Sequence, residues 1–348
     1  MNFDLNSLVR DNVKSLLPYS SARDEYKTDG KAMIFLDANE NPFENGLNRY
    51  PDPQQMLLKS KISEIKGVPE KQMLLGNGSD EVLDLIFRAF CEPGKDNVIS
   101  LPPTYGMYKV LSGINNIENR EVLLTSEFEP DVDAILEALD ANTKLLFLCS
   151  PNNPSGNSFN AETIKKLLRS FNGLVVIDEA YIDFSDDAGW SQSLDLYPNL
   201  LITQTFSKAF GMAGIRLGML FASAEIIKIL NRIKPPYNVN ELTQQKALEG
   251  LQNYLKIKQQ VIDIKRERDA LSKQLLQLKY VAKIFPSDAN FLLIKVDDAD
   301  QRYMELIGKG IVVRNRSKQP LCENCLRITV GTASENQNLL KAFKELES

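Results

Sequence analysis

Residues 144–181 read KLLFLCSPNNPSGNSFNAETIKKLLRSFNGLVVIDEAY. Two short apolar runs, 144–149 and 174–177, predict strands, and the apolar residues between them recur at helical spacing: Ile164, Leu167, Leu168 and Phe171. Strands that are apolar throughout and alternate with amphipathic helices favour a largely parallel sheet covered on both faces. This stretch therefore predicts an α/β fold.

The same alternation extends from residue 34 to residue 235. Further strand-like runs lie at 97–100, 120–124, 200–203 and 218–222, and a second helical pattern contains Leu83, Ile86, Phe87 and Phe90. The pattern stops at Pro235 and Pro236, because proline cannot continue a helix. We predict a large domain over 34–237.

A smaller α+β domain is predicted over 238–348. Its expected elements are a helical stretch at 240–279, strands at 290–296, 311–313 and 326–330, and helices near 299–307 and 334–347. The polar N-terminal segment, 1–33, has no closed pattern of its own. We predict that it joins the smaller domain.

Composition excludes several classes of protein. The 348 residues carry 41 Lys and Arg against 46 Asp and Glu, a net charge of −5, and 43% of them are hydrophobic. A disordered chain would have less apolar material, and a nucleic-acid binder would have a basic balance. No apolar run approaches the roughly 20 residues that cross a bilayer, and no signal-peptide pattern is visible. We expect a cytoplasmic protein that binds neither nucleic acid nor membrane.

The chain contains no histidine, which excludes histidine bases and histidine-ligated metals. Cys91 and Cys149 lie in apolar contexts, whereas Cys322 and Cys325 form a single Cys-x-x-Cys pair. One such pair without a second is weak evidence for a metal, and we predict no metal site. Any acid–base catalyst must then be Lys, Asp, Glu, Tyr or Cys, unless a cofactor contributes.

Two predicted strands are followed by residues that suit catalysis. Lys208 lies in the segment 205–216, TFSKAFGMAGIR, where a partly desolvated amine could form a Schiff base; a solvated loop lysine is the alternative. Arg216 could bind an anion in the same pocket. Asp178 ends an apolar strand, where it could pair with a cation in a ligand or cap the next turn.

Four further segments give weaker signals. Residues 75–81, LGNGSDE, open a helix with glycines, as anion sites do, although Ser79 and Asp80 also suit ordinary N-caps. The stiff loop at 149–156 could hold Asn153 at a ligand or be a plain turn. Tyr105 could stack on a flat ring or pack in the core. Arg327 interrupts an apolar strand, so it needs an anionic ligand or a structural ion-pair partner.

In this order, the residues resemble the fold-type I pyridoxal-phosphate aminotransferases of the aspartate aminotransferase superfamily. The shared elements are the NPSG loop at 153–156, Asp178 with Tyr181, the pair Ser207-Lys208, Arg216 and Arg327. The resemblance implies pyridoxal 5'-phosphate as the cofactor. It also implies a mixed, mostly parallel seven-stranded sheet flanked by helices, with a smaller α+β domain.

Within that superfamily, the chain is similar to the histidinol-phosphate aminotransferases. The stretches that carry this likeness are LPY at 17–19 with Ala22-Arg23, LDANENP at 36–42, NRYPD at 48–52, PTYGMY at 103–108, and Arg314 and Arg327 with the residues between them. Two positions depart from the family pattern. Ser155 stands where Thr is usual, and Asn315-Arg316 follows Arg314 where the family varies.

The resemblance implies a role for each matching residue. Lys208, Asp178 and Tyr181 would be catalytic: Lys208 would form the internal aldimine and then move the substrate proton, and Asp178 would pair with the pyridine nitrogen. The other implied cofactor contacts are Asn153 and Tyr181 at the ring oxygen, Tyr105 on the ring face, and Ser79, Asp80, Thr205, Ser207 and Arg216 at the phosphate. Tyr50 would reach the cofactor of a neighbouring subunit, which implies a homodimer. The implied substrate site contains Tyr19, Asn39, Tyr50, Asn153, Arg314 and Arg327.

The implied reaction transfers the amino group of L-histidinol phosphate to 2-oxoglutarate. It gives imidazole-acetol phosphate and L-glutamate in two half-reactions, as a step of L-histidine biosynthesis. The alternatives within the superfamily are an aromatic or broad-range aminotransferase and a threonine-phosphate decarboxylase. An alternative outside it is the cofactor-sensing domain of a transcription regulator, which the net charge of −5 disfavours.

Overall fold

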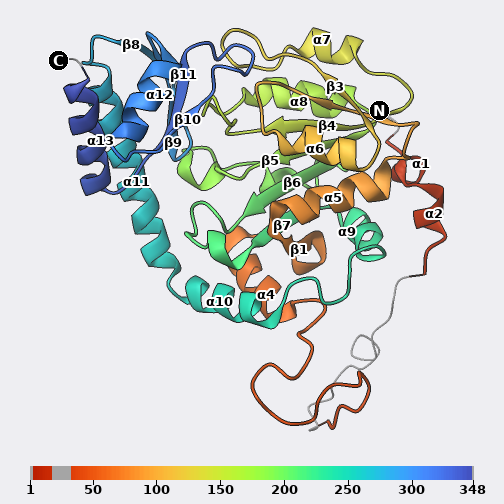
Figure 1. Cartoon of the computed structure of the whole chain (residues 1–348). Helices are drawn as coiled ribbons and strands as arrows, with labels where there is room; N and C mark the ends of the chain where they lie inside the picture. The colour runs from red at the N-terminus through yellow and green to blue at the C-terminus, as the bar shows by residue number, and fades with distance from the viewer. Residues whose placement is uncertain (1–2, 18–32, 347–348) are drawn as a thin grey trace.

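The computed structural model describes residues 3–17 and 33–346, which form two units (Figure 1). The larger unit is built on a seven-stranded sheet and the smaller on a four-stranded sheet. In Figure 1 the smaller unit, in blue, stands against one end of the larger sheet, and the long helix α11 leads into it. Among the described residues, no helix has the length and apolar character needed to span a membrane.

The large sheet has the strand order β1-β7-β6-β5-β4-β2-β3. Its strands are β1 Met73–Asn77, β2 Asn97–Ser100, β3 Glu118–Glu121, β4 Thr143–Cys149, β5 Leu174–Asp178, β6 Leu200–Thr205 and β7 Leu217–Ala222. The neighbours from β6 to β3 pair in parallel, whereas β7 is antiparallel to β1 and β6. The predicted mixed, mostly parallel seven-stranded sheet is confirmed.

Helices cover both faces of this sheet, because side chains of its buried strands alternate between two apolar clusters. In β4, Leu145 and Phe147 join the cluster that contains α5 and α6, whereas Leu146 and Leu148 join the one that contains α8. The helices of this unit are α4 Met56–Lys66, α5 Gly78–Phe90, α6 Met107–Ile114, α7 Val132–Glu137, α8 Ala161–Ser170 and α9 Ala224–Asn231.

The smaller unit is an antiparallel sheet packed against helices, with the strand order β10-β11-β9-β8. Its strands are β8 Val281–Ile284, β9 Phe291–Val296, β10 Arg314–Asn315 and β11 Cys325–Thr329. Its helices are α11 Tyr254–Leu275, α12 Ala299–Gly308 and α13 Ala333–Glu345, and α10 Glu241–Gln252 precedes them. The last helix starts with a capping box, in which Thr332 and Glu335 satisfy each other's backbone N–H groups.

Three predicted elements differ in detail. The strand expected at 120–124 lies at Glu118–Glu121, an edge strand of polar side chains, and Leu124 beyond it is buried in the core. The run at 311–313 is not a strand, because β10 begins at Arg314. The helical stretch at 240–279 is two helices that meet at Asn253.

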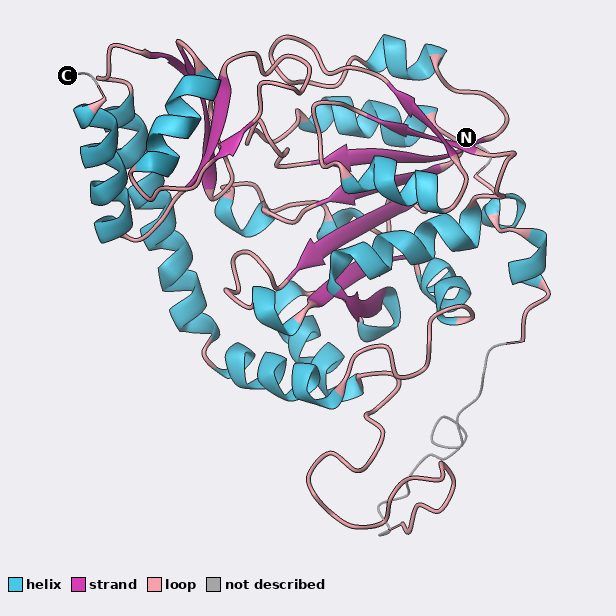
Figure 2. Cartoon of the chain, viewed as in Figure 1, coloured by secondary structure: helices cyan, strands magenta, loops and turns pink. Residues whose placement is uncertain are grey.

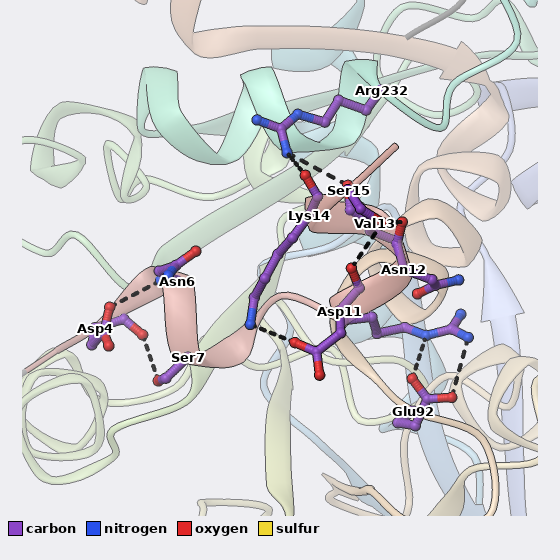
Figure 3. A network of polar contacts seen from close by, with 11 residues as sticks. Asp4, Asn6, Ser7, Asp11, Asn12, Val13, Lys14, Ser15, Glu92 and Arg232 are labelled. Carbon is purple, nitrogen blue, oxygen red and sulfur yellow. Dashed lines mark hydrogen bonds and ion pairs between the residues drawn. The ribbon is translucent and has the colours of Figure 1, made fainter. Parts of the chain in front are cut away.

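The N-terminal residues pack on the larger unit (Figure 3). The short helices α1 Leu5–Leu8 and α2 Asp11–Lys14 contribute Leu8 and Val13 to the apolar cluster around α5 and α9. The Arg10 guanidinium pairs with Glu92 at 3.1 Å, and Arg232, at the C-terminal end of α9, donates to the Lys14 carbonyl at 3.1 Å. Residues 3–17 thus contact the larger unit rather than the smaller one, and the predicted domain boundaries stay a prediction.

Candidate active site

A small hollow lies beyond the carboxyl ends of the central parallel strands, where ligands bind in open α/β sheets. Residues that follow β4, β5 and β6 line it together with the start of α5. The lining residues are Ser79, Asp80, Tyr105, Cys149, Asn153, Asp178, Ala180, Tyr181, Thr205, Ser207, Lys208, Ala213 and Arg216. Every cofactor-binding residue expected from the sequence is in this set except Tyr50.

Asp178 is the most deeply buried charged residue of the hollow, with 3% of its surface exposed. It is the last residue of β5, and its backbone lies between Cys149 of β4 and Thr203 of β6. Burial raises the pKa of this carboxyl group, whereas the hydrogen bond from Tyr108 lowers it. A buried carboxylate that is aimed at a hollow favours a ligand with a positive charge.

Tyr108 holds the Asp178 carboxylate, a contact that no sequence pattern indicates. Its hydroxyl donates to Asp178 Oδ2 at 2.8 Å, and the side chain is fully buried. The ring stacks on Phe147 at 4.8 Å between centroids and meets the edge of Tyr105 at 5.7 Å. The contact joins α6 to the end of β5, so only the folded sheet brings it about.

Lys208 follows β6 in a tight turn, in which Gly211 N donates to the Lys208 carbonyl at 3.0 Å. Its Nζ lies 5.5 Å from the centroid of the Tyr181 ring, over the hollow. The residue is exposed as a whole, but the partial burial of its amino group and the nearby Arg327 charge lower its pKa. A lowered pKa increases the fraction of free amine, which is the nucleophilic form.

The end of the hollow at the start of α5 is suited to an anion. The helix α5 starts at Gly78, so Ser79 and Asp80 lie in its first turn and Asn77, rather than either of them, is the N-cap. Gly78 allows a close approach, because a Cβ there would lie 2.7 Å from Arg216 Nη2. First-turn N–H groups of a helix have no intrahelical acceptor and favour negative ligands.

Side-chain donors complete this anion-binding end. Arg216 Nη1 donates to Ser207 Oγ at 3.4 Å, and its Nη2 lies 3.9 Å from Asp80 Oδ2. Thr205 Oγ1 donates to Ser207 Oγ at 3.1 Å. Asp80 in turn accepts a hydrogen bond from the Tyr105 hydroxyl at 3.0 Å, which fixes that ring beside the hollow.

Arg327 connects the smaller unit to the hollow. It lies on β11, and its guanidinium donates to Asn153 Oδ1 in the loop after β4. The guanidinium also lies 5.2 Å from the centroid of the Phe291 ring. Burial lowers the pKa of Arg327, and its Nε is buried without a hydrogen-bond partner within residues 3–17 and 33–346.

The remaining residues expected at the substrate site do not line this hollow. Tyr50 and Asn39 lie together at a separate hollow of about 440 Å³, where the Tyr50 ring stacks on Tyr237 at 4.4 Å. Arg314 is exposed and pairs across the sheet with Arg327. Tyr19 lies outside the described residues.

The sequence matches the family model for class I and II aminotransferases over residues 25–343, so the chain belongs to that class. Within the class it belongs to the histidinol-phosphate aminotransferase family. It is 69% identical over 347 residues to the histidinol-phosphate aminotransferase of Christiangramia forsetii, with 100% of this chain and 99% of that protein covered.

Solved structures have the same fold. The histidinol-phosphate aminotransferase from Clostridium acetobutylicum superposes with a TM-score of 0.80 at 24% identity, covering 86% of this chain and 91% of that one. The enzyme from Sinorhizobium meliloti, in complex with pyridoxal 5'-phosphate, gives 0.78 at 24% identity, covering 86% and 83%. At this identity the likeness establishes the fold alone.

The hollow fits pyridoxal 5'-phosphate, the cofactor of these aminotransferases. Its volume is about 180 Å³, and a cavity of roughly 150 Å³ holds a benzene ring. The buried Asp178 suits a protonated ring nitrogen, and the hydroxyl groups and Arg216 at the start of α5 suit a phosphate. Lys208 supplies the amine that would bind the cofactor's aldehyde carbon.

We predict that Tyr108→Phe destabilises the cofactor-free protein in a pH-dependent way. The folded state holds the Asp178 proton more tightly than the unfolded state does, because burial raises its pKa. The stability that this proton contributes is fully present below the pKa of Asp178 in the unfolded state. It is lost as the pH rises through the pKa of Asp178 in the folded state. Loss of the phenol raises the pKa of Asp178 in the folded state further. The free energy of unfolding of the variant should therefore fall by about 1.5–3 kcal/mol at pH 8 and by less at pH 5.

Urea unfolding at both pH values measures this difference. Thr243→Val is the control, because the Thr243 hydroxyl donates to the Ile215 backbone carbonyl at 2.9 Å and has no titrating acceptor. The Thr243→Val variant should lose the same free energy of unfolding at pH 5 and at pH 8. A Tyr108→Phe cost that is equally independent of pH would show that the phenol does not act on a charged Asp178.

Proposed function

We propose that this protein transfers the amino group of L-histidinol phosphate to 2-oxoglutarate, giving imidazole-acetol phosphate and L-glutamate, as a step of histidine biosynthesis. One observation carries the proposal: a nucleophilic lysine and a buried carboxylate, Lys208 and Asp178, share one ring-sized hollow. The relative that is 69% identical is itself a histidinol-phosphate aminotransferase, which favours this substrate. A cytoplasmic location suits the four cysteines, which are all free thiols.

Lys208 and Asp178 have separate tasks in this reaction. When bound, pyridoxal 5'-phosphate supplies an electron sink for the charge that forms on the substrate's Cα. Asp178 would keep the ring nitrogen protonated, because a carboxylate pairs with a protonated nitrogen. Lys208, released when the substrate amine takes its place, would accept the Cα proton at Nζ and pass it on, which needs no histidine. The lowered pKa of Lys208 suits this task.

The two substrates differ in shape but both carry anionic groups. Arg327 reaches the hollow through Asn153, and a guanidinium binds either a phosphate or a carboxylate by the same paired hydrogen bonds. We therefore assign Arg327 to the anionic group of whichever substrate is present. Because both substrates would use one site in turn, the kinetics should be ping-pong.

An aromatic aminotransferase or a threonine-phosphate decarboxylase would use the same cofactor residues. Product analysis separates them, with histidinol phosphate, phenylalanine and phosphothreonine each supplied alongside 2-oxoglutarate. We expect glutamate to form fastest from histidinol phosphate, and no CO₂ from phosphothreonine. Faster glutamate formation from phenylalanine, or release of CO₂, would replace the proposed activity by the corresponding alternative.

Lys208→Ala should abolish both the cofactor adduct that borohydride traps and the turnover with histidinol phosphate. Loss of a nucleophile that is also the general base should reduce turnover by at least about 10²–10⁴-fold. Lys165→Ala, at a partly exposed lysine on α8 that pairs with Glu162, should leave both unchanged. Mass spectrometry of the borohydride-treated protein detects the adduct, and its survival in Lys208→Ala would move the cofactor to another lysine.

We also propose that the protein acts as a homodimer in which Tyr50 serves the partner's active site. Residues 33–49 contain no helix or strand and form much of the long loop that extends from the body of the fold (Figure 2). This loop exposes large apolar side chains that its own unit leaves uncovered: Ile34, Leu36 and Phe43 are 80–87% exposed. An exposed apolar segment of this kind is typical of a protein interface.

Mixed dimers test this arrangement. Lys208→Ala and Tyr50→Ala should each be impaired alone, whereas a mixture refolded together should recover activity. The recovery arises because one site of the mixed dimer combines an intact Lys208 with the intact Tyr50 of the other subunit. A mass in solution of one chain, or the absence of recovery in verified mixed dimers, would contradict the proposal.

A further inference from the structure

Three arginines lie together on one side of the small sheet. Arg314 of β10 is opposite Arg327 of β11 in the antiparallel pair. The pairing continues past the strand end, because Arg316 N donates to the Cys325 carbonyl at 2.8 Å. Since alternate residues of a strand share a face, Arg314, Arg316 and Arg327 emerge on the same face.

This face is turned toward the active site. Cys325, which is two residues from Arg327, packs in the core cluster of the larger unit, and Arg327 itself donates to Asn153. Arg316 is close enough to Tyr181 for each to alter the other's pKa. Burial, with the charges of Arg327 and Arg314, lowers the pKa of Arg316 to about 10.

The cluster holds three positive charges. Within residues 3–17 and 33–346, none of the three arginines forms an ion pair with a carboxylate. In the same residues, Arg316 Nε and Arg327 Nε are buried without a hydrogen-bond partner. Buried charges and donors of this kind are costly unless a ligand pairs with them.

We propose that Arg316 is an anion-binding residue that selects the phosphate-bearing substrate over the carboxylate-bearing one. The inference rests on the proposed function, because it assigns a substrate group to a residue of the same site. A phosphate dianion has three terminal oxygens and two charges, so it can accept from Arg316 while Arg327 binds its other oxygens. Glutamate carries two separate carboxylates, and the one that takes the place of the phosphate has two oxygens and one charge, which a single guanidinium satisfies. Arg316 thus adds affinity for histidinol phosphate and little for glutamate.

The test compares Arg316→Gln with the wild-type holoenzyme in the two separate half-reactions. Lys318→Gln, at an exposed lysine two residues further on, is the control for a lost surface charge. Spectral titration of the bound cofactor gives an apparent dissociation constant for histidinol phosphate and one for glutamate. We expect Arg316→Gln to raise the apparent dissociation constant of histidinol phosphate by about 10–100-fold and to change that of glutamate by less than about 3-fold. Arg316→Lys should recover part of the difference, and Lys318→Gln should change neither.

A second readout does not depend on turnover. Inorganic phosphate should raise the melting temperature of the wild-type holoenzyme more than that of Arg316→Gln, with equal ionic strength maintained by chloride. An unchanged affinity of Arg316→Gln for histidinol phosphate, or an equal loss for both substrates, would overturn the inference and leave the proposed function intact. If wild-type protein failed to react with histidinol phosphate, the proposed function would fall. The phosphate titration would then still decide on Arg316, since equal shifts in wild type and variant would exclude it.

Discussion

The buried carboxylate of Asp178 is the constraint on which the active site depends. An apolar strand, with parallel neighbours on both sides, brings it to the end of the sheet with 3% of its surface exposed. A charge in that position is costly without partners. Tyr108 supplies one partner from α6, and the hollow leaves room for a second, cationic one. The same burial that raises the pKa of Asp178 would strengthen its proposed pairing with a protonated ring nitrogen.

The second constraint is the contact between the two units. The larger unit carries the proposed reacting groups, at the end of β5 and just after β6, whereas the smaller unit carries Arg327 on β11. Arg327 bridges the two by its bond to Asn153. The proposed reaction centre and the arginines proposed to bind the substrate's anionic group thus come from separate sheets, so the residues that select the substrate can change without altering those that hold the cofactor.

Much of this arrangement could be predicted from the sequence, because its signals are local. The apolar runs of β4 and β5 and the residues that directly follow them predicted both the parallel sheet and the place of Asn153 and Asp178. Lys208 and Arg216 could be predicted in the same way, from the segment after β6.

The parts that escaped prediction depend on tertiary contacts. The polar edge strand β3 and the two-residue strand β10 have no apolar pattern, so the neighbouring apolar runs gave the wrong boundaries. Tyr108 belongs to a stretch that resembles the family, but its bond to Asp178 exists only when α6 packs beside β5. The grouping of Arg316 with Arg327 follows from the register of β10 and β11, which spacing alone does not fix. The roles of all the site residues stay predictions, including those of Tyr19, Tyr50 and Asn39, which do not line the hollow or lie outside the described residues.

In the proposed reaction, one site, with Lys208 over a bound cofactor, takes the amino group from histidinol phosphate before 2-oxoglutarate enters. The most direct measurement is the absorption spectrum of the yellow protein after histidinol phosphate is added without 2-oxoglutarate. We predict rapid conversion of the visible cofactor band to that of the pyridoxamine form, in an amount equal to the number of sites, and much slower conversion with phenylalanine or phosphothreonine. A cofactor band that ignores histidinol phosphate but responds to another amine would contradict the substrate assignment.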